Sequence, residues 1–178
     1  SIYTVFGSNF GADASPLSLP AAYQEALPFG TNIGGINPLF VDSQPSSAFD
    51  SYLTVGITDG DTTGALGSIG IDFDAWTTDS SLFTDDGAVF WMSPADAPSG
   101  DAVVAQLTVG SQWTATMSAQ GKSVDGSDDW TVNGMFFSSA VAPAPAPGSD
   151  CAGEICSTVT VQSASLPGMS TYSLGISL

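Results

Sequence analysis

The stretch Tyr52-Leu53-Thr54-Val55-Gly56-Ile57-Thr58 decides the fold class. Leu53, Val55 and Ile57 fall on one face of an extended chain, whereas Tyr52 and the two threonines fall on the other, because successive side chains of a strand point in opposite directions. Alternation of this kind is typical of a strand with one buried face. We therefore expect a half-buried β-strand here.

The same period recurs along most of the chain. Four further runs have it: Ile69, Ile71 and Phe73; Val103, Ala105, Leu107 and Val109; Trp113, Ala115, Met117 and Ala119; and Trp130, Val132 and Phe136. Clusters rich in Asp, Gly, Ser and Pro separate the runs at 59–64, 85–87, 94–100 and 125–128. This spacing predicts an all-β, antiparallel, jelly-roll-like β-sandwich. The one short helix we expect lies over 21–26, where Pro20 precedes it and Pro28 ends it.

The C-terminal third carries a boundary signal. Residues 142–149 form a Pro/Ala spacer, which favours extended polyproline conformation. We therefore divide the chain into a sandwich domain over 1–141, the spacer, and a C-terminal extension over 150–178. Two strand-like runs in this extension, 158–162 and 171–178, are too short to form a core alone. They are expected to complete either their own sheet or that of a neighbouring subunit.

The charge of the chain excludes several partners. Its 178 residues include 18 acids and a single base, Lys122, which gives a formal charge of −17. Nucleic acids and anionic membrane surfaces attract proteins through Lys and Arg, so neither is an expected partner. The sequence also lacks an apolar run of about 18 residues, so membrane insertion is not expected. Adaptation to high salt is an alternative reason for the acidity.

Extracellular features accompany this acidity. The chain opens on Ser-Ile-Tyr-Thr-Val without an initiator Met, so we expect that a signal peptide has been removed and that the protein is secreted to the cell surface. Cys151 and Cys156 are its two cysteines, which predicts one short disulfide loop in an oxidising compartment. Two free thiols are the alternative.

Catalytic motifs are sparse. The sequence contains no histidine, which removes the commonest general base and the usual Ser and Cys triads. Asp72 and Asp74 alternate with Ile71 and Phe73 and could form the carboxylate pair of a glycosidase, but an Asp-rich strand yields such pairs by chance. Our expectation is that the protein is not an enzyme.

Calcium is the better use for clustered carboxylates, because it takes six to eight oxygen ligands, often in Gly-containing loops. None of the clusters is an EF-hand, since the twelfth residue counted from Asp59 is Gly70 instead of a bidentate Glu. Ordinary Asp-Gly turns facing solvent are the alternative. The candidate calcium ligands are Asp59, Asp61, Asp85, Asp86, Asp125, Asp128 and Asp129.

Tryptophans are the candidate glycan-stacking residues. Trp91, Trp113 and Trp130 lie in or beside apolar strand patterns, which predicts core packing. Trp76 follows the Asp72 and Asp74 pair and is the one we assign as a candidate sugar platform.

The stretch 48–137 resembles a type of secreted β-domain of marine and environmental microbes, which includes bacterial proteins sorted to the cell surface. The likeness rests on the runs 49–56, 86–90, 102–109 and 128–130, and upstream on 23–25 and 28–38. It implies a surface or matrix location and assigns no catalytic residue.

The sequence thus predicts a non-catalytic, extracellular structural subunit of a surface layer, appendage or filament, with calcium as a candidate stabilising ion. Self-association or contact with neighbouring surface proteins is the expected form of partnership. A carbohydrate-binding or adhesion module is the alternative, and an Asp-based glycosidase comes third.

Overall fold

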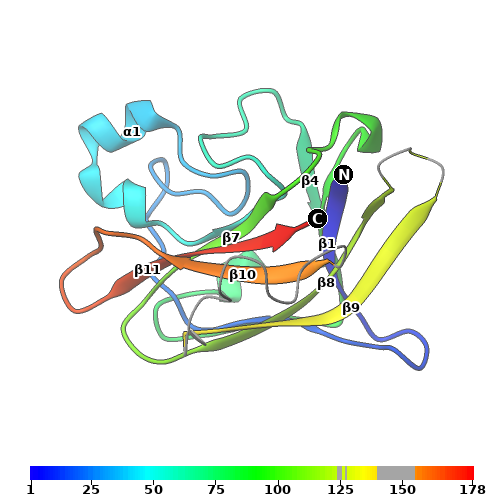
Figure 1. Ribbon diagram of the computed structural model, residues 1–178. Coiled ribbons are helices and arrows are strands. Elements are labelled where there is room, and N and C mark those ends of the chain that lie inside the picture. Colours follow the sequence, from blue (N-terminus) through cyan, green and yellow to red (C-terminus); the bar gives the residue numbers. More distant parts are fainter. Residues whose placement is uncertain (124–125, 127, 140–154) are drawn as a thin grey trace.

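The chain folds as two antiparallel β-sheets packed face to face (Figure 1). A computed structural model describes residues 1–123, 126, 128–139 and 155–178. Strands make up 45% of the structure and helices 11%. The predicted all-β sandwich is therefore confirmed.

The first sheet, sheet A, has seven strands in the described part of the chain. They are β1 (Ile2–Ser8), β2 (Leu17–Leu19), β4 (Leu66–Ile69), β5 (Leu82–Thr84), β6 (Asp86–Trp91), β8 (Thr114–Lys122) and β9 (Asp129–Ser138). Their order is β4-β6-β1-β8-β2-β5, and β9 also pairs with β8. β1 and β2 follow one another along the same edge of β8, because the amide of Ser8 donates to the carbonyl of Ser15 (2.8 Å) and closes the intervening loop.

The second sheet, sheet B, contains the C-terminal strands. Its order is β10-β11-β7-β3, with bounds Cys156–Val161, Ser170–Ser177, Ala102–Val109 and Tyr52–Leu53. β11 pairs with β7 from Ser170 opposite Val109 to Ile176 opposite Ala102. Of the two alternatives for the C-terminal extension, the fold thus has its strands in the sheet of their own chain.

The core lies between the two sheets, where the predicted alternation holds best. On β8, Ala115, Met117 and Ala119 are buried, and on β11 Leu174 and Ile176 are buried. Full burial of a large apolar side chain contributes about 1.5–3 kcal/mol. Both strands have one face on the core, so period two describes them correctly.

Strands β3 and β7 depart from the half-buried prediction, because a second layer covers the outer side of sheet B. Residues 51–55 are buried without alternation, and the strand expected over 52–58 is limited to Tyr52–Leu53. The Gln106 amide donates to the carbonyls of Ala48 (3.0 Å) and Asp50 (2.8 Å), which fixes this layer against β7. Polar side chains on β3 and β7 therefore face protein instead of water.

Strand β9 changes face along its length. Met135 and Phe137 are buried, whereas Phe136 is 55% exposed. Gly134 has a positive φ of 65°, and the pairing of β8 with β9 shifts register between Met117 and Ala119. The prediction that Phe136 shares a face with Trp130 and Val132 is wrong, because this irregularity reverses the alternation.

The helical segments lie elsewhere than expected. The amides of Ala22 and Tyr23 donate to the carbonyls of Thr77 and Thr108, and the helix expected over 21–26 does not form. Helix α1 instead spans Pro38–Ser43, and the Asn37 side chain caps it by accepting from the amide of Leu39 (3.0 Å). The short 3₁₀ helices η1, η2 and η3 span Pro45–Phe49, Phe73–Ala75 and Pro94–Asp96.

Candidate binding surfaces

Asp61, a candidate calcium ligand, shapes a turn. Its carboxylate accepts from the amides of Ala65 (2.9 Å) and Leu66 (2.8 Å) and from the hydroxyl of Thr63 (3.3 Å). Burial raises the pKa of Asp61, but these donors outweigh it and hold the pKa below its usual value. The oxygens that calcium would need are thus already engaged.

The other candidate ligands are scattered over the surface. Asp59, Asp85 and Asp86 are exposed, and Asp129 lies 3.6 Å from Lys122 in an exposed ion pair. Asp128 lies beside Asp129, and Asp125 lies outside the described residues. Within residues 1–123, 126, 128–139 and 155–178, His, Cys, Asp and Glu form no group of three that could hold a metal. Calcium binding stays a prediction.

Trp76 belongs to the core. It is only 2% exposed, and its indole N–H donates to the carbonyl of Pro20 (2.8 Å). A ring with neither face in solvent cannot stack on a sugar, so its assignment as a glycan platform is wrong. Asp72 and Asp74 are exposed, Asp72 at the N-terminal end of η2 and Asp74 within it, and not on a strand as expected.

Besides Asp125, two further predictions fall wholly or partly outside the described residues. The Pro/Ala spacer over 142–149 is one, and Cys151 is the other. Cys156 begins β10, and the described residues include no free cysteine. The Cys151–Cys156 disulfide therefore stays a prediction.

A buried carboxylate that the sequence did not reveal holds the layer over sheet B. Asp50 is fully buried and accepts from the amides of Glu25 (2.7 Å) and Thr31 (2.6 Å). Burial raises its pKa to about 6, although these amides pull the pKa down. Glu25 in turn accepts from the hydroxyls of Tyr23 and Ser46. Asp50 and Glu25 together position the 25–31 loop, and main-chain and hydroxyl donors occupy their carboxylate oxygens.

The outward side of sheet A carries exposed apolar side chains. Phe83 (62% exposed) lies opposite Ser18, Ser18 opposite Thr116, and Thr116 opposite Phe136. A second row runs through Ile69, which is 67% exposed, the half-buried Ala88 and Phe6, and the buried Ser118. We call these two rows the outer face of sheet A. Among the described residues, the acids on the outward side of these strands are Asp86 and the Lys122-paired Asp129.

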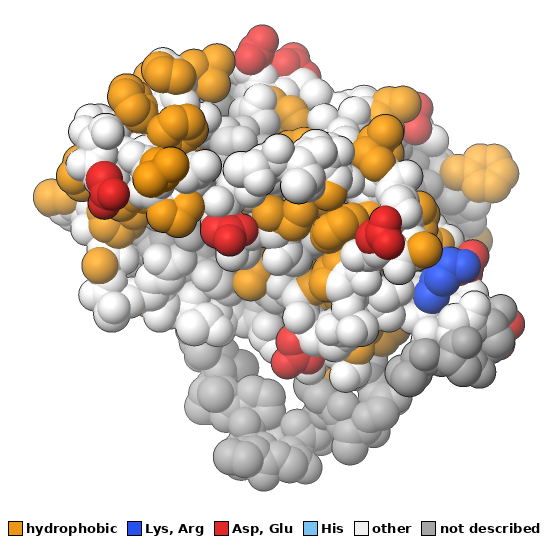
Figure 2. Space-filling model, turned by 90° about the horizontal axis from the view of Figure 1, so that it is seen from above, with side chains coloured by type: hydrophobic (Ala, Val, Ile, Leu, Met, Phe, Trp, Pro, Cys, Tyr) orange, Lys and Arg blue, Asp and Glu red, His pale blue; other side chains and the backbone are white. Residues whose placement is uncertain are grey.

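A second apolar area surrounds α1. Figure 2 shows hydrophobic side chains gathered at the left of the view, over the part of the molecule that carries α1. Leu27 is 85% exposed, Leu39 72% and Phe40 40%. A hollow of about 470 Å³ opens beside Phe40, with Asn37 and Asp61 among its lining residues. Phe29 supports Phe40 edge to face at 5.9 Å.

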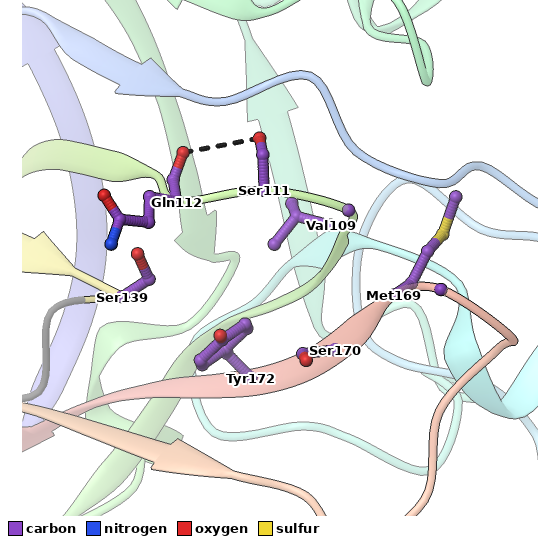
Figure 3. Close-up of a pocket in the computed structure, with 9 residues that line it drawn as sticks. Val109, Ser111, Gln112, Ser139, Met169, Ser170 and Tyr172 are labelled. Atoms are coloured by element: carbon purple, nitrogen blue, oxygen red, sulfur yellow. Dashed lines mark hydrogen bonds between the residues drawn. The ribbon is translucent and has the colours of Figure 1, made fainter.

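A third surface feature is a hollow of about 270 Å³, which we call the Tyr172 hollow (Figure 3). It lies where the β7–β8 connection, the end of β9 and the start of β11 meet. Its lining residues are Val109, Gly110, Ser111, Gln112, Ser139, Gly168, Met169, Ser170 and Tyr172. None of them is charged.

Comparison with known proteins gives no assignment: no family model, curated protein or solved structure matches the chain. Among the described residues, no helix is long and apolar enough to cross a membrane.

Proposed function

We propose that this protein is a non-catalytic structural subunit of an extracellular layer, appendage or filament, and that copies associate through the outer face of sheet A. The observation that carries the proposal is the pair of exposed rings on that face. Phe83 and Phe136 lie on the same cross-strand row with Ser18 and Thr116 between them. Exposed apolar side chains that gather on one face are a feature of interaction sites.

The size of the face favours a weak contact. Across the sheet the seven described strands occupy five positions, because β1 and β2 share one position and β6 and β5 share the next. Five positions at about 4.8 Å spacing span about 19 Å. Along the strands, the nine residues of β8 extend about 30 Å. The face thus offers roughly 600 Å² per copy, less than the roughly 800 Å² per partner of a stable complex. Weak contacts suit a layer or filament, in which each subunit makes several of them.

Charge supports the choice of this face. A chain with net charge −17 repels its own copies, so contact is least opposed where acids are few. Asp86 and the Lys122-paired Asp129 are the acids on the outward side of the described strands. Salt, or a cation such as calcium that neutralises the remaining acids, would favour assembly.

Sedimentation velocity over a range of protein concentrations tests the proposal. The wild type should self-associate as concentration and salt rise, and the double variant Phe83→Thr/Phe136→Thr should remain monomeric. Threonine keeps strand propensity on the exposed positions. Leu39→Ser, which removes a more exposed apolar side chain from α1, is the control and should associate like the wild type.

Two results would contradict the proposal. One is a wild type that stays monomeric at millimolar concentration and high salt. The other is a Leu39→Ser variant that loses association while the double variant retains it, since this would move the contact to α1.

A carbohydrate-binding module is a second candidate function. It is supported by a separate observation, the uncharged Tyr172 hollow.

A further inference from the structure

The Tyr172 hollow is neutral in a strongly acidic protein. The chain contains 18 acids, yet the hollow is lined by serine, glutamine, tyrosine, glycine and two apolar residues. An anionic or cationic ligand would find no countercharge among these residues. A neutral ligand that carries its own donors and acceptors fits the lining better.

The hydroxyl protons of two serines in the lining are held only by long hydrogen bonds. The Ser111 hydroxyl donates to the Gln112 carbonyl at 3.4 Å and the Ser139 hydroxyl to the Trp113 carbonyl at 3.5 Å. Both distances exceed the 2.5–3.0 Å range of good O–H···O bonds, so a ligand oxygen would compete well for these protons. The amide of Gln112 adds both a donor and an acceptor. Figure 3 shows Gln112, Ser139 and Tyr172 on one side of the hollow and Met169 on the other.

The ring of Tyr172 gives the hollow an aromatic wall of fixed orientation. It packs against Trp113 edge to face, with ring centroids 5.1 Å apart and planes at 73°. Trp113 is only 5% exposed, so the support for Tyr172 is part of the core. Aromatic walls of this kind bind the C–H faces of sugar rings, whereas the hydroxyls of the sugar take the polar groups.

The walls are formed before a ligand binds. Ser170 pairs with Val109 at the start of the β11–β7 ladder. The Trp113 amide donates to the Ser139 hydroxyl (2.9 Å), and the Ser139 amide donates to the Trp113 carbonyl (3.0 Å). A preformed site loses little entropy on binding, which a small site requires.

We propose that the Tyr172 hollow binds one ring of a neutral glycan. Its volume of about 270 Å³ lies just below the roughly 300–1,000 Å³ of drug-sized pockets, which limits the ligand to about one ring. Gln112 and the serines take the sugar hydroxyls, and Tyr172 takes the apolar face of the ring. The site is independent of the outer face of sheet A and would serve a subunit that attaches to surface polysaccharide.

Amide chemical shifts of the ¹⁵N-labelled protein, titrated with cellohexaose, laminarihexaose and maltohexaose, test the site. At least one of these neutral oligosaccharides should shift the Gln112 side-chain amide and the amides of Gly168 and Ser170, with saturation. Gln112→Ala should weaken this binding about tenfold, the effect of one lost hydrogen bond. Tyr172→Phe, which keeps the ring and its contact with Trp113, should weaken it less.

Gln44→Ala, an identical change beside α1, is the matched control and should bind like the wild type. A heparin hexasaccharide should leave the shifts of the hollow unchanged, because the ligand is anionic. The proposal is overturned if none of the three neutral oligosaccharides shifts the hollow at millimolar concentration. It is also overturned if shifts map elsewhere, or if a folded Gln112→Ala variant, checked by its amide spectrum, binds as tightly as the wild type.

Discussion

At the scale of single residues, the buried carboxyl group of Asp50 makes the free energy of unfolding depend on pH. Burial raises its pKa from the ordinary 3.8 to about 6, although the amides of Glu25 and Thr31 donate to it. Between these two values the folded state holds the proton more tightly than the unfolded chain. The stabilisation is therefore complete below about pH 4 and is lost as pH rises through about 6.

The first prediction concerns this residue. The wild-type free energy of unfolding should fall by up to roughly 3 kcal/mol between pH 4 and 7 through Asp50. In Asp50→Asn that part of the pH dependence should be missing. Urea unfolding at a series of pH values measures it, with exposed Asp13→Asn as the control. Parallel pH profiles for the wild type and Asp50→Asn would contradict the assignment.

Asp61 provides a second prediction at this scale. Asp61→Ala leaves the amides of Ala65 and Leu66 without their acceptor. Because the turn is partly exposed and water can replace the carboxylate, the cost should be about 1 kcal/mol, seen as a lower urea midpoint. Asp59→Ala, a change at the neighbouring exposed acid, should have little effect. An equal loss in both variants would argue that the cluster acts as a unit, as a metal site would.

At the scale of elements, β10 and β11 form a C-terminal hairpin that completes sheet B. β11 buries Leu174 and Ile176 in the core and packs Tyr172 on Trp113. The fully buried Leu174 and Ile176 contribute about 1.5–3 kcal/mol each, a large share of the roughly 5–15 kcal/mol by which domains are stable. Truncation after Gly148 should therefore give an unfolded or aggregated protein.

Circular dichroism and size-exclusion chromatography of the truncated chain measure this outcome. A mild truncation that removes only Leu178, which is 42% exposed, is the control and should fold. A soluble, folded monomer after truncation at Gly148 would contradict completion in the same chain. It would favour the alternative in which the hairpin adds to a neighbouring subunit.

Sequence periodicity predicted which residues of a strand are buried only where the other face of that strand meets water. β8 fulfils this condition, and its core residues Ala115, Met117 and Ala119 were predicted correctly. β3 and β7 do not, because residues from 21–50 cover them through contacts such as Gln106 to Asp50, which local patterns cannot reveal. The alternation of buried and exposed side chains on β9 reverses near Gly134, and this depends on the register of β9 against β8. Helix α1 had a readable signal, since Asn37-Pro38 is a cap followed by proline at the first turn.

The binding surfaces were less predictable than the core. The outer face of sheet A brings Phe83 and Phe136 together from positions more than 50 residues apart, and their common row depends on the strand order of the folded sheet. The lining of the Tyr172 hollow has no motif, because serine, glutamine and glycine are ordinary turn residues. Trp76 was misassigned because its neighbours in sequence are acidic, whereas its neighbours in space are apolar.

At the scale of the whole molecule, the net charge of −17 opposes compaction. Sodium chloride should therefore raise the melting temperature by screening, because the Debye length falls from about 10 Å at 0.1 M to about 3 Å at 1 M. Thermal unfolding at increasing salt measures this. A melting temperature that is constant or falls would contradict it.

Calcium chloride at matched ionic strength tests the calcium prediction. A larger rise in melting temperature than sodium chloride gives would support a calcium site, and an equal rise would contradict it.

The most direct test of the central claim is a map of the self-contact on the unmodified protein. Amide spectra of the ¹⁵N-labelled wild type, compared between dilute and concentrated solutions at high salt, locate the residues that meet. The account predicts concentration-dependent shifts at Ser18, Phe83, Thr116 and Phe136 on the outer face of sheet A, with those of α1 unchanged. Shifts confined to Leu39 and Phe40, or spectra that do not change with concentration, would contradict it.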